Sequence, residues 1–242
     1  MKTLVVGGSG ATGRKLVEQL LALGQEVKVI LRSTGNIPEH WKNKGNCSLV
    51  IANINEIGVE EMAGYIKDCQ AVVSCLGHNM SMSGLFGKPR KLVRDAVQLL
   101  CDSIERNGAD NPIKLVLMNT AGDRNKDLVE ALTFKERIVI GLIRKLLPPH
   151  SDNEEAAEYL RVNIGQNNPL LEWVVLRPDS LINEEKVTVY KLYPSPIRSA
   201  IFNPGKTSRV NVGHAMAQLI VNDELWASWK GKMPVIYNEG SR

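Results

Sequence analysis

The residues best suited to bind a ligand stand near the start of the chain, where Gly7, Gly10 and Gly13 follow a short apolar run. Glycines at this spacing let the chain turn sharply and let backbone N–H groups approach a ligand closely. The next residues have helical periodicity, and a helix N-terminus offers unpaired N–H donors and a partial positive charge. The pattern predicts a pyrophosphate-binding loop with contacts from Gly7, Ser9, Gly10, Ala11, Thr12 and Gly13.

The end of the second apolar run, Glu26–Leu31, bears on which dinucleotide would bind. An acidic residue there would accept hydrogen bonds from the adenosine ribose and favour NAD(H). The chain instead has Arg32 and Ser33, and a guanidinium suits a 2′-phosphate through charge-assisted hydrogen bonds. These residues predict a preference for NADP(H) over NAD(H). The alternative is an arginine that faces solvent.

The elements that must position these residues alternate between short apolar runs and helical patterns, as in a parallel sheet covered by helices. The predicted strands are Thr3–Val6, Glu26–Leu31, Ser48–Ala52, Ala71–Leu76, Lys114–Asn119 and Trp173–Leu176. The predicted helices are Ala11–Leu23, Val59–Ile66, Lys91–Asn107 and Glu154–Asn163. The order predicts an α/β fold with a Rossmann-like, doubly wound parallel sheet of about six or seven strands.

Two later stretches depart from this alternation. Thr133–Leu147 has the pattern of an apolar and basic helix that ends before Pro148 and Pro149, and Asn183–Lys206 is irregular. Late insertions in doubly wound folds often build the substrate side of the crevice. We therefore expect one domain over residues 1–242 with a small C-terminal substrate lobe, from insertions at about 133–150 and 183–208. The basic helix would alternatively lie on a membrane surface.

The composition excludes several classes of function. The 242 residues carry a net charge of +4, and lysine and arginine are scattered rather than clustered, so nucleic-acid binding is not expected. The four cysteines have no metal-binding spacing, which predicts buried free thiols and no metal. The first apolar run is too short for a secretion signal, and no run of 18 apolar residues follows. The expectation is a cytoplasmic monomer or homodimer with a small-molecule substrate and no integral membrane segment.

The chain also resembles the atypical short-chain dehydrogenase/reductases, in particular their NmrA-like and biliverdin/flavin reductase-like branch. The likeness covers most of the chain and is carried by the glycine loop, Arg32 and three strand ends, Val72–Gly77, Leu117–Thr120 and Val175–Pro178. It implies that the strand end at Ser74, Cys75, Leu76 and Gly77 passes the cofactor ribose. It further implies that Asn119 and Thr120 face the nicotinamide, with Arg177 and Pro178 flanking its other side.

Some of these residues also suit a structural role instead of a contact with the cofactor. Ser74 and Cys75 also suit the interior of a packed strand, and Thr120 also suits a turn. In the family an acidic residue follows the third strand near the adenine, whereas this chain has Asn53 and Ile54, which leaves hydrogen bonding available.

The Tyr-x-x-x-Lys pair of typical short-chain dehydrogenases, in which lysine lowers the pKa of tyrosine, is not visible. The fourth residue after Tyr159 is Asn163, and this tyrosine lies late in its helix, so packing is the expected role. Alignment by the helix end puts His150 beside the expected tyrosine position, as a candidate proton donor or a loop residue. The catalytic candidates are Thr120 and His150, and the acceptor-site candidates are His78, Asn79, Lys88 and Arg90.

Two functions from different classes agree with this pattern. The first is an NADP(H)-dependent oxidoreductase that passes hydride to a flavin, a quinone or a carbonyl compound, with positioning supplying much of the catalysis. The second is a non-catalytic NADP(H)-binding redox sensor of the NmrA-like type, which the missing pair favours. Isomerase or epimerase chemistry comes third, because it also relies on the absent tyrosine and lysine.

Overall fold

The structure, a computed structural model, describes residues 1–35, 37–78, 89–130, 133–146 and 148–240. Its main sheet has eight strands in the order β3-β2-β1-β4-β5-β6-β10-β8. All neighbours pair in parallel except β8, which runs antiparallel to β10 at one edge. The strands are β1 (Lys2–Val6), β2 (Glu26–Leu31), β3 (Cys47–Ile51), β4 (Ala71–Ser74), β5 (Ile113–Met118), β6 (Leu171–Pro178), β8 (Tyr190–Tyr193) and β10 (Val235–Asn238). The order 3-2-1-4-5-6 is that of a Rossmann-like doubly wound sheet, so the predicted fold class is confirmed.

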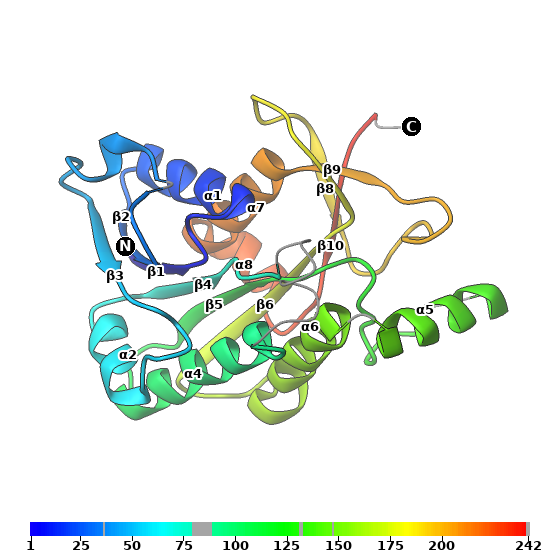
Figure 1. The fold of residues 1–242 in the computed structure, drawn as a ribbon, viewed down its shortest axis with the longest axis horizontal. Coiled ribbons are helices and arrows are strands. Elements are labelled where there is room, and N and C mark those ends of the chain that lie inside the picture. Colours follow the sequence, from blue (N-terminus) through cyan, green and yellow to red (C-terminus); the bar gives the residue numbers. More distant parts are fainter. Residues whose placement is uncertain (36, 79–88, 131–132, 147, 241–242) are drawn as a thin grey trace.

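Helices cover both faces of this sheet (Figure 1). One face carries α1 (Ala11–Ala22), α7 (Arg209–Val221) and α8 (Asp223–Trp229). The other carries α2 (Val59–Ile66), α4 (Leu92–Asn107) and α6 (Pro148–Glu158), which continues into a π-helix, Tyr159–Ile164. A short 3-10 helix, Glu39–Trp41, joins β2 to β3. Each face has its own core, as expected for parallel strands that are apolar on both sides.

A closely packed contact between α1 and α7 fixes the position of the helix that follows the glycine loop. A Cβ atom added at Gly213 of α7 would lie 2.7 Å from the backbone nitrogen of Leu16 in α1. The two helix backbones therefore approach at a point where only glycine fits. The glycine loop at the start of α1 is thereby held against the sheet by a second helix.

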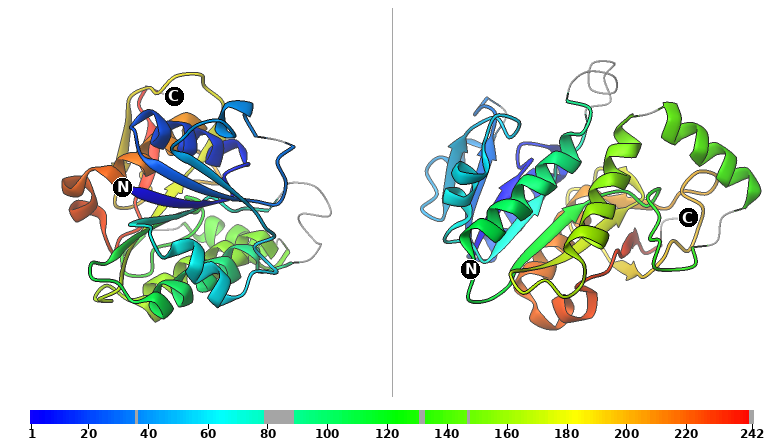
Figure 2. Two further views of the ribbon diagram at one scale, coloured as in Figure 1. Left: turned by 90° about the vertical axis from the view of Figure 1, so that its left-hand side faces the viewer. Right: turned by 90° about the horizontal axis from the view of Figure 1, so that it is seen from below.

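The remaining elements gather at the carboxyl ends of β5 and β6. Helix α5 (Phe134–Leu146) projects from the body of the molecule in Figure 1 and in the right-hand view of Figure 2. A two-stranded parallel sheet, β7 (Ser180–Ile182) with β9 (Lys206–Ser208), lies on the same side. The two predicted insertions thus lie at the carboxyl edge, where ligands bind in open α/β sheets.

Three predictions about elements need correction. The helix expected over Glu154–Asn163 begins at Pro148, because proline suits the first turn of a helix, where its missing N–H needs no partner. The stretch expected to be irregular, Asn183–Lys206, contains β8, which pairs with β10. The sheet has eight strands rather than six or seven, because β8 and β10 are short and weakly patterned.

The four cysteines are free, and three of them are buried. Burial raises the pKa of the Cys75 thiol to about 12 and that of the Cys69 thiol to about 11. These thiols are protonated at neutral pH and behave as small apolar residues. Within the described ranges, every helix is too short or too polar to cross a membrane.

Candidate functional site

The glycine loop forms a cradle of bare backbone between β1 and α1. Gly7 has a φ of +77°, and a Cβ there would lie 2.6 Å from the carbonyl carbon of Cys75. A Cβ on Gly13 would lie 2.2 Å from the Gly7 oxygen, whereas one on Gly10 would lie 3.2 Å from the same oxygen. The backbone N–H of Gly10 donates to that oxygen at 3.1 Å, which closes the turn. Side chains at Gly7 and Gly13 would collide with backbone atoms, so this tight turn requires glycine at both positions.

The first turn of α1 leaves its backbone donors available. Its N-cap, Gly10, makes no side-chain capping bond, and the first turn holds no acidic residue. The nearby Arg14 donates from Nε to the Ser9 carbonyl at 3.1 Å. A helix N-terminus without a carboxylate or hydroxyl cap fits an external anion. The start of α1 therefore has neither a side-chain cap nor an acidic residue.

Arg32 lies exposed immediately after β2, and Ser33 is exposed beside it. Among the described residues, no hydrogen bond or ion pair engages the Arg32 guanidinium. Asn53, after β3, donates from Nδ2 to Glu56 at 2.7 Å and shapes a turn, while the neighbouring Ile54 is buried. The structure therefore places Arg32 and Asn53 after two adjacent strands, with Arg32 available for a ligand.

The end of β4 lies against the glycine loop, as the Gly7–Cys75 contact shows. Ser74 and Cys75 are themselves buried, Leu76 is partly buried and Gly77 is exposed. The Ser74 hydroxyl has no hydrogen-bond partner among the residues that the structure describes. The side chains of Ser74 and Cys75 are packed in the core, so any contact they make with a cofactor would come from the backbone.

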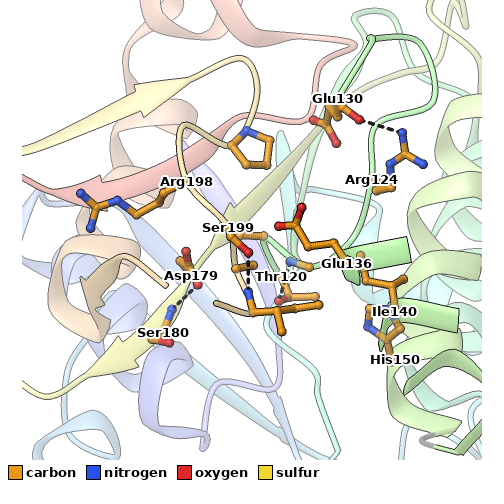
Figure 3. Close-up of a pocket in the computed structure, with 15 residues that line it drawn as sticks. Thr120, Arg124, Glu130, Glu136, Ile140, His150, Asp179, Ser180, Arg198 and Ser199 are labelled. Atoms are coloured by element: carbon orange, nitrogen blue, oxygen red, sulfur yellow. Dashed lines mark hydrogen bonds between the residues drawn. The ribbon is translucent and has the colours of Figure 1, made fainter. Parts of the chain in front are cut away.

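A cavity of about 320 Å³ opens beyond the ends of β5 and β6 (Figure 3). Its polar walls come from the segment after β5, from α5 and α6, and from the segments around Asp179 and Ser199. The labelled residues that line it are Thr120, Arg124, Glu130, Glu136, Ile140, His150, Asp179, Ser180, Arg198 and Ser199. Its size suits a small organic molecule. Both catalytic candidates, Thr120 and His150, thus meet at one cavity although they lie on different elements.

Thr120 and His150 are held differently. The Thr120 hydroxyl accepts a hydrogen bond from the Gly122 N–H at 3.2 Å, so it also shapes a turn. His150 lies in the first turn of α6. Its Nε2 is buried, forms no hydrogen bond to any described residue, and lies 3.4 Å from Glu154 Oε1. An imidazole nitrogen in this position is able to exchange a proton with a neighbouring carboxyl group.

The cavity wall on α5 is fixed by a reciprocal capping pair. Glu136 Oε2 accepts from the Thr133 N–H at 2.7 Å, and the Thr133 hydroxyl accepts from the Glu136 N–H at 3.3 Å. A hydrogen bond from Ser199, together with these Thr133 bonds, lowers the pKa of Glu136. Glu136 therefore joins the two insertions across the cavity as a carboxylate. The Thr-x-x-Glu spacing is a sequence signal that would have identified this residue.

The Arg177 side chain points into the protein, so the predicted contact of the Arg177–Pro178 segment with the nicotinamide would have to come from other atoms of that segment. Arg177 is fully buried, and its guanidinium forms two bonds to the Glu130 carboxylate, at 2.7 and 3.2 Å. It also donates to the carbonyl oxygens of Asp123 and Met233, each at 2.7 Å. The side chain ties β6 to the loop after β5 and to β10, so it supports the cavity from behind. Pro178 ends β6, and its carbonyl accepts from the Ala121 N–H at 2.8 Å.

Asn119 holds the loop after β5 to α6. Its Nδ2 donates to the Asn153 carbonyl at 2.9 Å, and its Oδ1 accepts from the Thr120 N–H at 2.8 Å. With 7% of its surface exposed, Asn119 positions Thr120 rather than facing a ligand with its own side chain.

His78 and Asp152 form a second buried pair that sequence reasoning did not detect. Asp152 Oδ2 lies 2.7 Å from His78 Nε2, just beyond β4. The same carboxylate accepts from the N–H groups of Val93 and Arg94 at the start of α4, at 2.8 and 2.9 Å. Three segments therefore meet on one carboxylate. Of the other acceptor candidates, Arg90 is exposed, whereas Asn79 and Lys88 lie outside the described residues.

Tyr159 packs against the core on the α4 side. Its hydroxyl lies 3.4 Å from Asp102, and the Arg94 guanidinium stacks 5.6 Å from its ring centroid. These contacts agree with the predicted packing role. Among the described residues, no group of three or more His, Cys, Asp or Glu side chains is arranged to hold a metal ion.

Comparison with known proteins places the chain among nucleotide-binding proteins. A family model described as NAD(P)H-binding matches residues 7–223. An uncharacterized chloroplastic protein of Arabidopsis thaliana is 27% identical over 192 residues, which are 77% of this chain and 67% of that protein.

Solved structures share the fold at low sequence identity. A short-chain dehydrogenase/reductase of Veillonella parvula in complex with NADP has a TM-score of 0.72 at 14% identity and covers 99% of this chain and 95% of its own. An anaerobillin reductase of Escherichia coli O157:H7 has a TM-score of 0.70 at 13% identity, covering 100% and 99%. An oxidoreductase of Lactococcus lactis has a TM-score of 0.69 at 16% identity, covering 100% and 92%.

Proposed function

Because the chain belongs to the NAD(P)H-binding family, we propose that it is an NADP(H)-dependent oxidoreductase that reduces a small organic acceptor. The observation that carries this proposal is the position of two sites at one edge of the sheet. The bare glycine cradle follows β1, and the polar cavity follows β5 and β6. Ligands in doubly wound sheets bind across this edge. A reduced nicotinamide there would supply hydride to the acceptor.

The residues of the chain have separate roles in this proposal. The Gly7–Gly13 loop and the start of α1 hold the pyrophosphate, and Arg32 with Ser33 holds the 2′-phosphate. His150 donates a proton to the acceptor, and the Thr120 hydroxyl orients it. The acceptor is a flavin, a quinone or another conjugated or carbonyl compound. A protein of the same fold is named an anaerobillin reductase, which agrees with a reductase function.

Cofactor preference is tested by Arg32→Asp. Loss of a charge-assisted bond to the 2′-phosphate removes roughly 1.5–3 kcal/mol, so affinity for NADPH falls about 10- to 100-fold. Affinity for NADH stays within about threefold of the wild type or rises, because the new carboxylate accepts from the ribose hydroxyls. Fluorescence titration with both cofactors measures the ratio.

The matched control for Arg32→Asp is Lys67→Asp, which makes the same change of charge at an exposed position after α2. Its affinities for both cofactors should equal those of the wild type. If Arg32→Asp weakened NADPH and NADH equally, Arg32 would not determine the preference.

Catalysis is tested by oxidation of NADPH in the presence of a panel of flavins, quinones and aldehydes. His150→Gln should lower kcat about 100-fold or more for acceptors that take up a proton, with unchanged affinity for NADPH. Tyr159→Phe is the control, because the tyrosine hydroxyl faces Asp102 rather than the cavity, and its kcat should match the wild type. Turnover that is equal in His150→Gln and the wild type would remove His150 from the mechanism.

A second candidate function is an NADP(H)-binding sensor that engages a partner protein. The observation that favours it lies on the projecting helix α5, where Ile138 and Leu142 are 50% and 53% exposed. Exposed apolar side chains one turn apart suit a contact surface. Tight binding of NADPH without turnover of any acceptor in the panel would support this function over the enzyme.

A further inference from the structure

Two carboxyl groups, Asp123 and Glu154, are not among the residues that line the acceptor cavity, and one of them lies close to His150. Asp123 is 4% exposed, and its Oδ2 accepts from Asn119 Nδ2 at 3.2 Å. The Glu154 side chain is 17% exposed, and its Oε1 is the atom 3.4 Å from His150 Nε2. Glu154 thus lies between the imidazole of His150, which lines the acceptor cavity, and a second cavity that Glu154 shares with Asp123.

Asp123 and Glu154 line a second, smaller cavity of about 250 Å³. Its walls also include Lys126 and Glu158, whose side chains are 60% and 35% exposed. The cavity is therefore close to solvent at Lys126 and reaches the buried carboxyl group of Asp123. Water in such a polar cavity would connect Asp123 to solvent.

The charges around Asp123 favour its protonated form. Burial, followed by the negative charge of Glu154, raises the pKa of Asp123 to about 8, and Glu130 adds in the same direction. The positive charge of Arg177 and the Arg124 N–H act in the opposite direction. The Arg177 guanidinium contacts the Asp123 carbonyl oxygen, and within the described residues no cation forms an ion pair with its carboxyl group. Asp123 thus carries a proton at neutral pH.

We propose that Asp123 and Glu154 hold one exchangeable proton and pass it through His150 to the acceptor. This inference rests on the proposed function. As hydride reaches the acceptor carbon, the acceptor heteroatom takes a proton from Nδ1 of His150. At the same time Asp123 gives its proton to Glu154, and Glu154 gives a proton to Nε2 of His150. Solvent then reprotonates Asp123 through the smaller cavity.

The pH dependence of turnover tests the relay. Below about pH 8 the wild-type pair holds its proton, and above it the proton is lost, so kcat should decline through that pH. Asp123→Asn should remove this inflection and lower kcat at pH 7 by at least about 10-fold, with unchanged affinity for NADPH. Asp127→Asn, an exposed carboxyl paired with Arg161 on the same loop, is the control and should keep the wild-type profile.

A readout independent of activity is the titration of the Asp123 carboxyl group in the protein alone. Carboxyl carbon NMR should show one aspartate titrating near pH 8. The signal should be absent in Asp123→Asn. In Glu154→Gln it should move to lower pH, because the neighbouring negative charge is gone. If Asp123→Asn folds poorly, the shift of the Asp123 titration in Glu154→Gln still tests the interaction between the two carboxyl groups.

The outcomes separate the relay from the proposed function. Turnover by the wild type with an unchanged pH profile in Asp123→Asn would overturn the relay and leave the function standing. Titration of Asp123 near pH 4 would likewise overturn it. Absence of turnover with every acceptor would overturn the proposed oxidoreductase function. It would also overturn proton delivery to an acceptor, whatever the NMR titration of Asp123 shows.

Discussion

Gly13→Ala is expected to reduce the affinity for NADPH by more than about 100-fold, through the loss of several hydrogen bonds to phosphate at roughly 1.5–3 kcal/mol each. The added Cβ would lie 2.2 Å from the Gly7 oxygen and 3.0 Å from the Gly7 carbon. Both atoms are backbone, so the loop itself has to move, and its N–H groups then no longer converge on one anion. Fluorescence titration with NADPH measures the loss.

Two further alanine substitutions, at Gly10 and Gly64, provide comparisons for the loss of NADPH affinity in Gly13→Ala. At Gly10 the Cβ would lie 3.2 Å from the Gly7 oxygen, which needs a shift of only a few tenths of an ångström, so the loss should be smaller. At Gly64, inside α2, nothing lies within 4 Å, and alanine should leave binding unchanged while stabilising the helix by about 0.5–1 kcal/mol. Wild-type affinity in Gly13→Ala would mean that the loop does not bind the pyrophosphate.

Arg177→Met is expected to lower the free energy of unfolding by about 3–5 kcal/mol. The substitution leaves the Glu130 carboxylate buried without its cation and the carbonyl oxygens of Asp123 and Met233 without their donors. Urea unfolding followed by circular dichroism measures the change. The exposed pair Arg106–Glu60, with side chains 60% and 76% exposed, provides the comparison. Arg106→Met should cost at most about 1 kcal/mol.

The double variant distinguishes the ion pair from simple loss of packing. In a Glu130→Gln background, Arg177→Met should cost less than in the wild type, because no buried charge is left unpaired. Equal costs in the two backgrounds would show that Arg177 stabilises the protein through its other contacts.

The sequence alone predicted the doubly wound fold and the glycine cradle, because both depend on local pattern. A strand, three spaced glycines and a helix follow one another within 22 residues, and each has its own periodicity. The strand β10, by contrast, is four residues long and forms because β6 and β8 flank it. Pairing between segments distant in the chain leaves little trace in a single sequence.

The candidate site was predicted in part, and the misses share a cause. Thr120 and His150 were identified as candidates, and the fold brings both to one cavity. Arginine side chains are rarely fully buried, so the type of residue at position 177 did not predict its interior position. The raised pKa of Asp123 depends on burial and on Glu154, 31 positions later in the chain. Environments of this kind arise only when distant segments fold together.

The carboxylate of Asp152 limits which segments of the chain can be replaced by those of a homologue, in evolution or in design. Asp152 lies two residues after His150 on α6, yet it bonds His78 after β4 and two N–H groups at the start of α4. A chimera that receives residues 133–158 from a relative without a carboxylate at position 152 would lose contacts in the half that carries the glycine loop. Recombination between homologues should therefore succeed only when positions 78 and 152 are inherited together.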